Sequence, residues 1–508
     1  MADVEKKAAV EGDIFAVERA NNSKERQSHF IVTPEEESAV IRKLDWHLLP
    51  LVFALYTLSI LDRSNLGNAK LAGLSKDIDL SGNRYSWLGT IFYIGYITSQ
   101  WTQIGFKHFK PHIWVSSVVV VWGLLASVQA AVTSWGGLMA LRFLLAIPEA
   151  AFGPGVPLYL SFFYPRDKVA FRHGVFISGA AMANVYGGLL AYGITQIKGS
   201  LAPWKILFLI EGLPTLIFAV IAFCFMPDGI LEAKFLTERE KEIAVHMTAR
   251  NQELDVGKEH GIRFKELLAG IRDPKSFIPA FCYFGCNVSF ASLPLFLPTI
   301  ISEMGSFTIV QSQGLSSPPY LLCFFVIITL CFLSDYFKMR GPFVALAAIT
   351  GAVGFIIQAT CSKTGPRYFG VFLSVQIFAS IALLLAWTAN IHATESKRAG
   401  AYTGNAFLVQ AFAEEFTNTP AVLATIGQCG PLLGTNIFPT SEKPYYRKGM
   451  WISAAMCLMV AVLAGILSSW LIYENKKMER EGVPEVEEFE ETSVAREDGQ
   501  RLKHRFIW

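Results

Sequence analysis

Residues 46–68 read WHLLPLVFALYTLSILDRSNLGN, and this stretch decides the fold. Its apolar run, continued by the small residues that follow, is long enough to cross a hydrocarbon core about 30 Å thick as one helix. Asp62 and Arg63 interrupt the run side by side. A charged side chain at mid-helix costs about 2.5–3.5 kcal/mol on the insertion scale, so such residues face the interior of a bundle and usually serve transport. The alternative is that the pair marks the end of a short span at the membrane surface.

The whole chain has the composition of a membrane protein. Of its 508 residues, 52% are hydrophobic and 17% are charged, whereas soluble proteins carry about 25% charged residues. Apolar runs long enough to span a bilayer are expected at 46–68, 86–106, 113–132, 137–160, 173–196, 204–226, 276–300, 317–337, 341–361, 367–391, 420–438 and 449–473. Two sets of six runs predict an all-α membrane protein with twelve transmembrane helices in two six-helix halves.

These runs divide the chain into five segments. We expect a cytosolic tail at 1–45, a six-helix bundle at 46–226, a charged cytosolic linker at 227–275, a second bundle at 276–473 and a cytosolic tail at 474–508. The first tail has no apolar stretch typical of a signal peptide, so the first span is expected to act as the insertion signal. Lys and Arg are enriched in the short loops on the side of the linker and tails, which predicts that both termini are cytosolic.

Other classes of protein lack support in the sequence. Basic residues lie in loops rather than in one patch, so no nucleic-acid partner is expected. All eight cysteines fall in apolar runs, where they are interpreted as small hydrophobic residues rather than disulfides or metal ligands. The phosphate-binding loop of ATP-driven pumps and the Gly-x-Ser-x-Gly and His-Glu-x-x-His motifs of hydrolases do not occur. We therefore expect neither an enzyme nor a cofactor or metal site.

Two further ionisable residues lie inside the fourth run. Arg142 and Glu149 are nearly two helical turns apart, so they share one face of a helix at a separation of about 10 Å along its axis. We expect Glu149 near the bilayer midplane and both Arg142 and Arg63 in the outer half. Two arginines above one deep carboxylate indicate an anion site coupled to a proton acceptor. The alternative is that Glu149 is only the structural partner that neutralises Arg142.

Several aromatic and polar residues inside the apolar runs are weaker candidates for substrate binding. Tyr93 and Tyr96 in the second run, and Trp387 with Asn390 in the tenth, either hydrogen-bond a substrate or pack as ordinary core residues. The sequence alone does not decide between these two readings.

Several motifs taken together resemble the fungal anion:cation symporter branch of the major facilitator superfamily. The motifs are Leu61-Asp62-Arg63-Ser64-Asn65-Leu66-Gly67-Asn68-Ala69, Arg142-Phe143-Leu144-Leu145 through Glu149-Ala150-Ala151-Phe152-Gly153-Pro154-Gly155, Phe296-Leu297-Pro298-Thr299-Ile300, Gly314-Leu315-Ser316-Ser317-Pro318-Pro319-Tyr320, Ser334-Asp335 with Arg340-Gly341, Lys397-Arg398-Ala399 and Asn436-Ile437-Phe438-Pro439. That branch includes permeases for allantoate, nicotinate and pantothenate and is generally taken to use proton symport. The resemblance covers roughly 45–473 and implies the major facilitator fold.

The resemblance also implies roles for individual residues. The span-1 and span-4 arginines of related carriers engage the anion, whereas the span-1 Asp and span-4 Glu take part in proton coupling. The resemblance thus implies Arg63, Arg142 and Tyr96 as substrate-binding residues, and Glu149 and Asp62 as proton-coupling residues. Asn65 and Trp387 are further candidate substrate-binding residues.

Three features depart from the family pattern. Residues 100–103 lack the usual proline, and Asp335 is followed by Tyr336 where the family has arginine. About twenty residues, roughly 401–420, separate Lys397-Arg398-Ala399 from the eleventh span, where the family has none. This insert is either a cytosolic bulge or the product of a gene-model error such as a retained intron.

The leading hypothesis is a proton-coupled importer of a small organic anion that works by alternating access, as a monomer, in the plasma membrane and without a cofactor. Two alternatives stay open. One is an exporter of a larger secondary metabolite, and the other is a nutrient-sensing receptor that binds its ligand without net flux.

Overall fold

The computed structural model describes residues 32–197, 199–253, 274–305, 307–391 and 426–480. Within these ranges all regular structure is helical. The insert predicted near 401–420 lies outside them, as do most of the two predicted tails.

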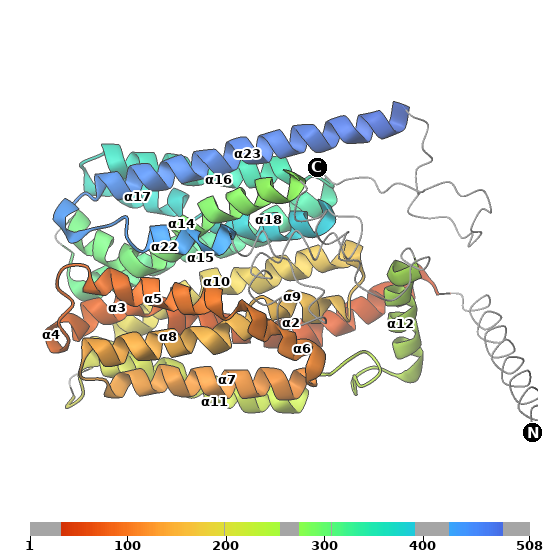
Figure 1. The fold of residues 1–508 in the computed structure, drawn as a ribbon, viewed down its shortest axis with the longest axis horizontal. Helices are drawn as coiled ribbons and strands as arrows, with labels where there is room; N and C mark the ends of the chain where they lie inside the picture. The colour runs from red at the N-terminus through yellow and green to blue at the C-terminus, as the bar shows by residue number, and fades with distance from the viewer. Residues whose placement is uncertain (1–31, 198, 254–273, 306, 392–425, 481–508) are drawn as a thin grey trace, which may run out of the picture.

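The helices form two bundles that lie side by side along their length (Figure 1). The first bundle contains α2 (Pro34–Ser64), α3 (Leu66–Ala69), the π-helix η1 (Lys70–Leu74), α4 (Ser75–Asp77), α5 (Arg84–Thr98), the 3₁₀-helix η2 (Gln100–Ile104), α6 (Gly105–His108), α7 (Pro111–Val128), η3 (Gln129–Ala131), α8 (Trp135–Phe152), α9 (Gly155–Ser161), α10 (Arg166–Ile194) and α11 (Pro203–Phe225). The second contains α14 (Pro274–Met304), α15 (Ile309–Tyr336), α16 (Gly341–Thr360), α17 (Thr364–Ser374), α18 (Ile377–Ile391), α22 (Gly430–Gly434), η4 (Thr440–Glu442) and α23 (Arg447–Arg480).

Among the described residues, ten helices are long and apolar enough to cross a membrane. They coincide with ten of the twelve predicted runs. The predicted run at 420–438 begins outside the described residues, and the one at 86–106 is not a single helix. The prediction of an all-α membrane fold is confirmed.

The first span continues past its two charged residues. A capping box fixes its start, because the Thr33 side chain accepts from the Glu36 N–H while the Glu36 carboxylate accepts from the Thr33 N–H. At the other end, Asn65 keeps helical backbone angles and its N–H donates to the Leu61 carbonyl, so the chain runs on into α3. The reading in which Asp62 and Arg63 mark the end of a short span is therefore wrong.

The second span is broken where one continuous helix was expected. After α5 ends at Thr98, the chain turns through η2 before α6 begins. Near this junction the Thr98 hydroxyl donates to the carbonyls of Ile94 and Gly95, and the Thr102 hydroxyl donates to the Ser99 carbonyl. Hydroxyls that compete for backbone carbonyls in this way destabilise or bend helices.

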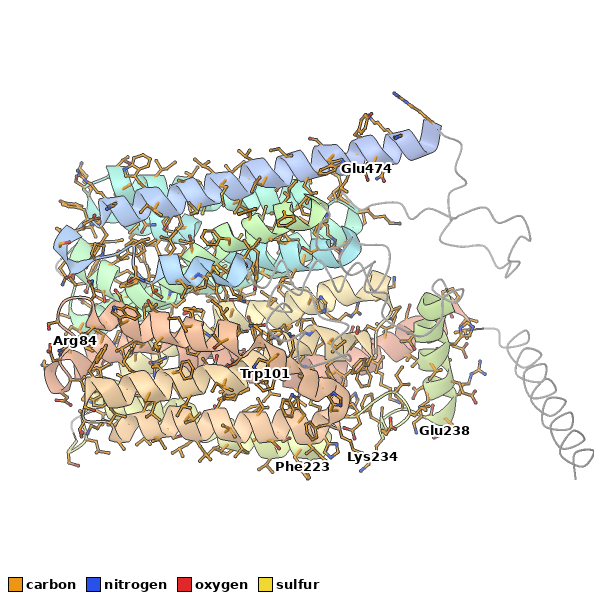
Figure 2. The ribbon with its side chains drawn as sticks, viewed as in Figure 1. Arg84, Trp101, Phe223, Lys234, Glu238 and Glu474 are labelled. Carbon is orange, nitrogen blue, oxygen red and sulfur yellow. The ribbon has the colours of Figure 1, made fainter. Side chains whose placement is uncertain are left out.

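The outward surface of the bundles is apolar, and charged residues lie at their two ends. Ile217, Val220 and Phe223 of α11 are all more than half exposed. Figure 2 shows Phe223 on the outer edge, with Arg84 at one end of the bundles and Glu238 at the other. A soluble monomer rarely exposes such a continuous apolar surface, whereas lipid requires one.

The linker contributes α12 (Glu238–Glu253), which packs across the start of α2 (Figure 1). Lys43 pairs with Glu240 at 2.7 Å. The ring of His47 stacks on Phe235 with centroids 4.2 Å apart. We call this end of the molecule the α12 end and the opposite one the α4 end.

Hydrogen bonds join the two bundles toward the α4 end. The Tyr85 hydroxyl donates to the Leu295 carbonyl at 2.7 Å, and the hydroxyls of Thr90 and Thr435 lie 2.8 Å apart. At Gly67 the backbones approach so closely that a Cβ atom would lie 2.6 Å from the Pro294 carbonyl oxygen. The bundles are therefore in tight contact on this side.

Candidate functional site

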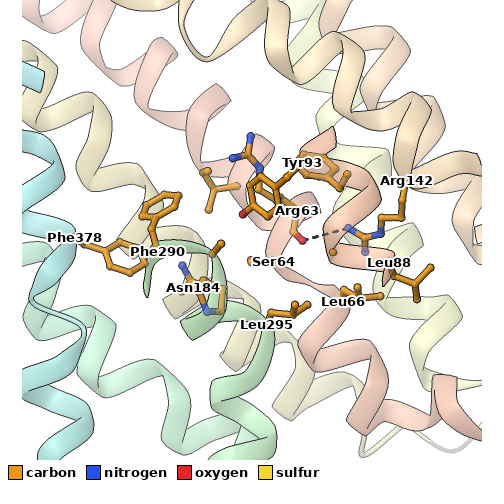
Figure 3. Close-up of a pocket in the computed structure, with 15 residues that line it drawn as sticks. Arg63, Ser64, Leu66, Leu88, Tyr93, Arg142, Asn184, Phe290, Leu295 and Phe378 are labelled. Carbon is orange, nitrogen blue, oxygen red and sulfur yellow. Dashed lines mark hydrogen bonds between the residues drawn. The ribbon is translucent and has the colours of Figure 1, made fainter. Parts of the chain in front are cut away.

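A pocket lies between the two bundles. The first bundle lines it with both polar and apolar side chains, and the second with apolar ones only (Figure 3). The polar members are Arg63, Ser64, Tyr93, Arg142 and Asn184, and the members from the second bundle are Phe290, Ala291, Pro294, Leu295 and Phe378. The space open to the centres of water-sized spheres is about 30 Å³.

A buried ion pair lies at one wall of the pocket. The Arg63 Nη2 and Nε atoms donate to the same Glu149 oxygen, Oε2, at 2.8 and 3.1 Å. The Ser59 hydroxyl donates to this oxygen as well, at 3.2 Å. The Glu149 side chain is fully buried, and its second oxygen has no hydrogen-bond partner among the described residues. Burial makes this pair sensitive to any change in the charge of either member.

Two aromatic rings of α5 hold the Arg63 guanidinium in place. Its central carbon lies 4.9 Å from the ring centre of Phe92 and 4.8 Å from that of Tyr96. A guanidinium at this distance from an aromatic face is attracted by the ring quadrupole. The structure thus places Tyr96, a candidate substrate-binding residue, beside the candidate Arg63.

Arg142 lines the same pocket but binds backbone rather than a carboxylate. Its Nη1 atom donates to the carbonyls of Asp62 and Arg63 at 3.4 and 3.2 Å, and Figure 3 shows the second of these bonds. Its Nε and Nη2 atoms are buried and find no hydrogen-bond partner in the part of the chain that the structure describes. The direct ion pair of Glu149 is with Arg63 rather than with Arg142, so the alternative in which Glu149 is the structural partner of Arg142 finds no direct contact in its support.

Asp62 and Arg63 point in different directions, because successive residues of an α-helix are rotated by about 100°. Arg63 faces the pocket, whereas the buried Asp62 carboxyl lies near Trp122 of α7 and Thr215 of α11. The structure therefore separates the two neighbours that the sequence presents as one pair.

Two other predicted residues do not reach the pocket wall. Asn65 is fully buried, and its side-chain amide has no hydrogen-bond partner within the described ranges. Trp387 is fully buried on α18, with its ring against Gly341 at the start of α16. Neither lies among the residues that line the pocket around Arg63.

Sequence reasoning missed several residues that line the pocket, and one buried charge that lies outside its lining. Asn184 is a polar residue in an apolar run and could have been found by that signal. Glu211, a buried carboxylate on α11, also interrupts an apolar run and was overlooked. Phe290 and Phe378 carry no such signal, because aromatic residues are common in every span.

Two helical bundles with an apolar exterior and a charged pocket at their junction define a membrane transporter. The chain belongs to the major facilitator superfamily. The family model described as Major Facilitator Superfamily matches residues 52–414 of the chain. The protein is a multi-pass membrane transporter rather than an enzyme, as predicted, and the fold is that of the superfamily.

Several fungal transporters are similar over most of the chain. The MFS-type transporter efuF of Hormonema carpetanum is 31% identical over 453 residues, which is 88% of each chain. The major facilitator-type transporter hxnP of Emericella nidulans is 31% identical over 467 residues, or 90% of each chain. The high-affinity nicotinic acid transporter of Saccharomyces cerevisiae is 31% identical over 458 residues, covering 89% of this chain and 80% of the relative.

Solved structures of remote relatives share the fold alone. The proton:xylose symporter XylE superimposes with a TM-score of 0.60 at 12% identity, covering 84% of this chain and 95% of that one. A bacterial homologue of the human lysosomal transporter Spinster, in an inward-facing and unoccupied conformation, gives 0.57 at 15% identity, with 87% and 99% covered.

Proposed function

We propose that this protein is a proton-coupled symporter of a small organic anion. The observation that carries the proposal is the buried Arg63–Glu149 ion pair at the wall of a pocket that also presents Arg142. An anion that enters the pocket competes with Glu149 for Arg63. Protonation of Glu149 removes this competitor, and thereby links anion binding to proton binding.

The charge balance favours this coupling. Breaking a buried ion pair by removing one partner costs about 3–5 kcal/mol, because the other charge stays buried and uncompensated. If a proton neutralises Glu149 while an anion binds Arg63, every charge remains balanced. If the anion enters alone, one surplus negative charge stays in the membrane interior, which is unfavourable.

The size of the pocket implies a conformational change. On this measure of cavity volume, a single water molecule needs about 10–15 Å³. The pocket measures about 30 Å³, which holds only a few water molecules and is too small for an organic acid. Substrate entry therefore requires the bundles to separate at one end, as alternating access demands. The hydrogen bonds toward the α4 end, such as that of Tyr85, support a state closed on that side.

The positions of the residues in the structure support their proposed roles to different degrees. Arg63 and Arg142 bind the anion in this proposal, Tyr96 orients Arg63, and Glu149 carries the coupling proton, with Asp62 assisting from the far side of α2. The positions of Asn65 and Trp387 add no support for substrate contact. We place the protein in the plasma membrane as a monomer. The Lys and Arg bias of the loops supports a cytosolic position for both termini.

Nicotinate is the first substrate to test. It is a flat aromatic carboxylate, which suits a pocket lined by two arginines and by the rings of Phe290 and Phe378, and one relative is named as a nicotinic acid transporter. The purified protein in liposomes is expected to accumulate labelled nicotinate when the proton concentration is higher outside. Other small carboxylates would then be tested as competitors.

Two variants separate coupling from stability. Glu149→Gln is expected to lose gradient-driven accumulation, whereas Glu238→Gln, on the exposed linker helix, serves as a matched control with wild-type uptake. Accumulation by Glu149→Gln at the wild-type level would overturn the coupling assignment. Flux only out of the vesicle lumen would instead identify an exporter, and binding without flux would identify a receptor.

A further inference from the structure

A second group of buried charges lies on the side of α2 that faces away from the pocket. It consists of Asp62 of α2, Arg142 of α8 and Glu211 of α11, whose exposed fractions are 3%, 1% and 1%. We call these three residues the rear cluster. Arg142 belongs both to the rear cluster and to the pocket wall.

The three charges of the rear cluster act on one another. The electrostatic neighbours of the Glu211 carboxyl are Asp62 and Arg142. The Asp62 carboxyl lies near Thr215, whose hydroxyl donates to the Glu211 carbonyl oxygen at 3.1 Å. Glu149 also acts on the cluster, because it is the first charged neighbour of both Asp62 and Arg142. The Trp122 indole lies near Asp62, and the Tyr85 hydroxyl lies near Arg142.

The polar atoms of the rear cluster are poorly satisfied. Both Glu211 carboxyl oxygens, Asp62 Oδ2, and Arg142 Nε and Nη2 are buried and have no hydrogen-bond partner among the residues that the structure describes. A buried polar group without a partner costs about 1–3 kcal/mol, and more if it is charged. Buried groups of this kind call for an explanation, and a functional role is one of the recognised ones.

The formal charges of the buried residues show that the rear cluster lacks one positive charge. Arg63 and Glu149 cancel in their ion pair. One cation and two carboxylates remain, Arg142 with Asp62 and Glu211, so the net charge is 1 − 2 = −1. An uncompensated charge at this depth in a membrane protein is unfavourable. One proton on either carboxyl group restores neutrality.

We propose that Asp62 and Glu211 hold one proton between them. Glu211 thereby acts as a positioning residue, because the charge it carries influences Arg142, which belongs to the proposed anion site. This inference rests on the proposed function as far as the anion is concerned. Loss of the shared proton adds a negative charge behind Arg142 and weakens anion binding. Affinity for the anion then falls as the pH rises.

Single and double substitutions leave the rear cluster with different net charges: neutral in each single variant and positive in the double variant. In Asp62→Asn or Glu211→Gln one carboxylate remains for Arg142, so the cluster is neutral without a proton. In the double variant Arg142 has no counter-charge. Each single variant is therefore expected to fold and bind, and the double variant to lose more stability than the two single losses combined.

The shared proton can be detected without any substrate. Infrared spectra of the purified protein near neutral pH are expected to show the carbonyl stretch of a protonated carboxylic acid. Glu211→Gln and Asp62→Asn should each lose this band, Glu211→Asp should keep it, and the exposed control Glu238→Gln should not change it. A band that persists in both Glu211→Gln and Asp62→Asn, or that the wild type lacks, would overturn the proposal.

A transport measurement provides the second readout. The KM of the wild type for nicotinate is expected to rise as the pH increases, and Glu211→Gln should lose the part of this rise that the shared proton causes while keeping its kcat. An identical pH profile in both proteins would reject the role of Glu211. Because the infrared band needs no substrate, its absence and a failure of gradient-driven uptake are distinguishable.

Discussion

Gly67→Ala should push open the contact between the bundles toward the α4 end. The added Cβ atom would lie 2.6 Å from the Pro294 carbonyl oxygen and 2.8 Å from that of Leu295, both of which are backbone atoms of the opposite bundle. Overpacking of this kind costs about 1–3 kcal/mol. The cost applies only to the conformation in which the bundles touch here. At 1.4 kcal/mol per factor of ten, the ratio of closed to open molecules should fall about 5- to 150-fold.

Spin labels on the two bundles can measure this shift. Ser75 of α4 and Ser362, just before α17, are both exposed and suit labelling as cysteines in a cysteine-free background that retains wild-type uptake. Gly67→Ala should add a population at longer distance. Gly136→Ala is the matched control, because a Cβ atom there would meet nothing within 4 Å. Equal distance distributions in the two variants would refute the reasoning.

The other predictions concern the site and the loops. Phe92→Leu removes one ring from beside Arg63 and should weaken nicotinate binding about 2- to 30-fold relative to Phe92→Tyr; equal dissociation constants would contradict this. Tyr85→Phe loses a hydrogen bond between the bundles worth about 0.5–1.5 kcal/mol and should shift the spin-label distances in the same direction as Gly67→Ala, but less; unchanged distances would reject it. Backbone and side-chain hydrogen bonds from Ser81 lower the pKa of Asp79, so this turn is stabilised at neutral pH and loses that stabilisation as the pH falls through the lowered pKa. Deuterium exchange corrected for intrinsic rates should show the turn opening in acid, and constant protection would argue against it.

The sequence was informative where a residue type contradicts its surroundings. Asp62, Arg63, Arg142 and Glu149 stand out because charge is costly in an apolar run, and all four are buried or nearly so in the structure. Glu211 carries the same signal and was within reach of the same reasoning. The number and order of the spans follow from the lengths of the apolar runs, which depend only on local composition.

The pairing of these charges could not be predicted from the sequence. Whether Glu149 meets Arg63 depends on how α8 is rotated against α2, and no spacing along the chain determines that rotation. The side chains of Phe290 and Phe378 face the pocket only because α14 and α18 turn those faces toward the first bundle. The same residues would read identically in the sequence if they faced lipid.

The second bundle lines the pocket with apolar groups only, whereas both pocket arginines and the Glu149 carboxylate belong to the first. In the proposed symporter, the groups that bind the charge of the substrate and the groups that contact its apolar part therefore belong to different bundles. Exchange of side chains such as Phe290 or Leu295 can alter which anion fits without disturbing the ion pair. In the proposed symporter, substrate preference can therefore change through substitutions in the second bundle, while the residues proposed to couple transport to protons stay unchanged in the first.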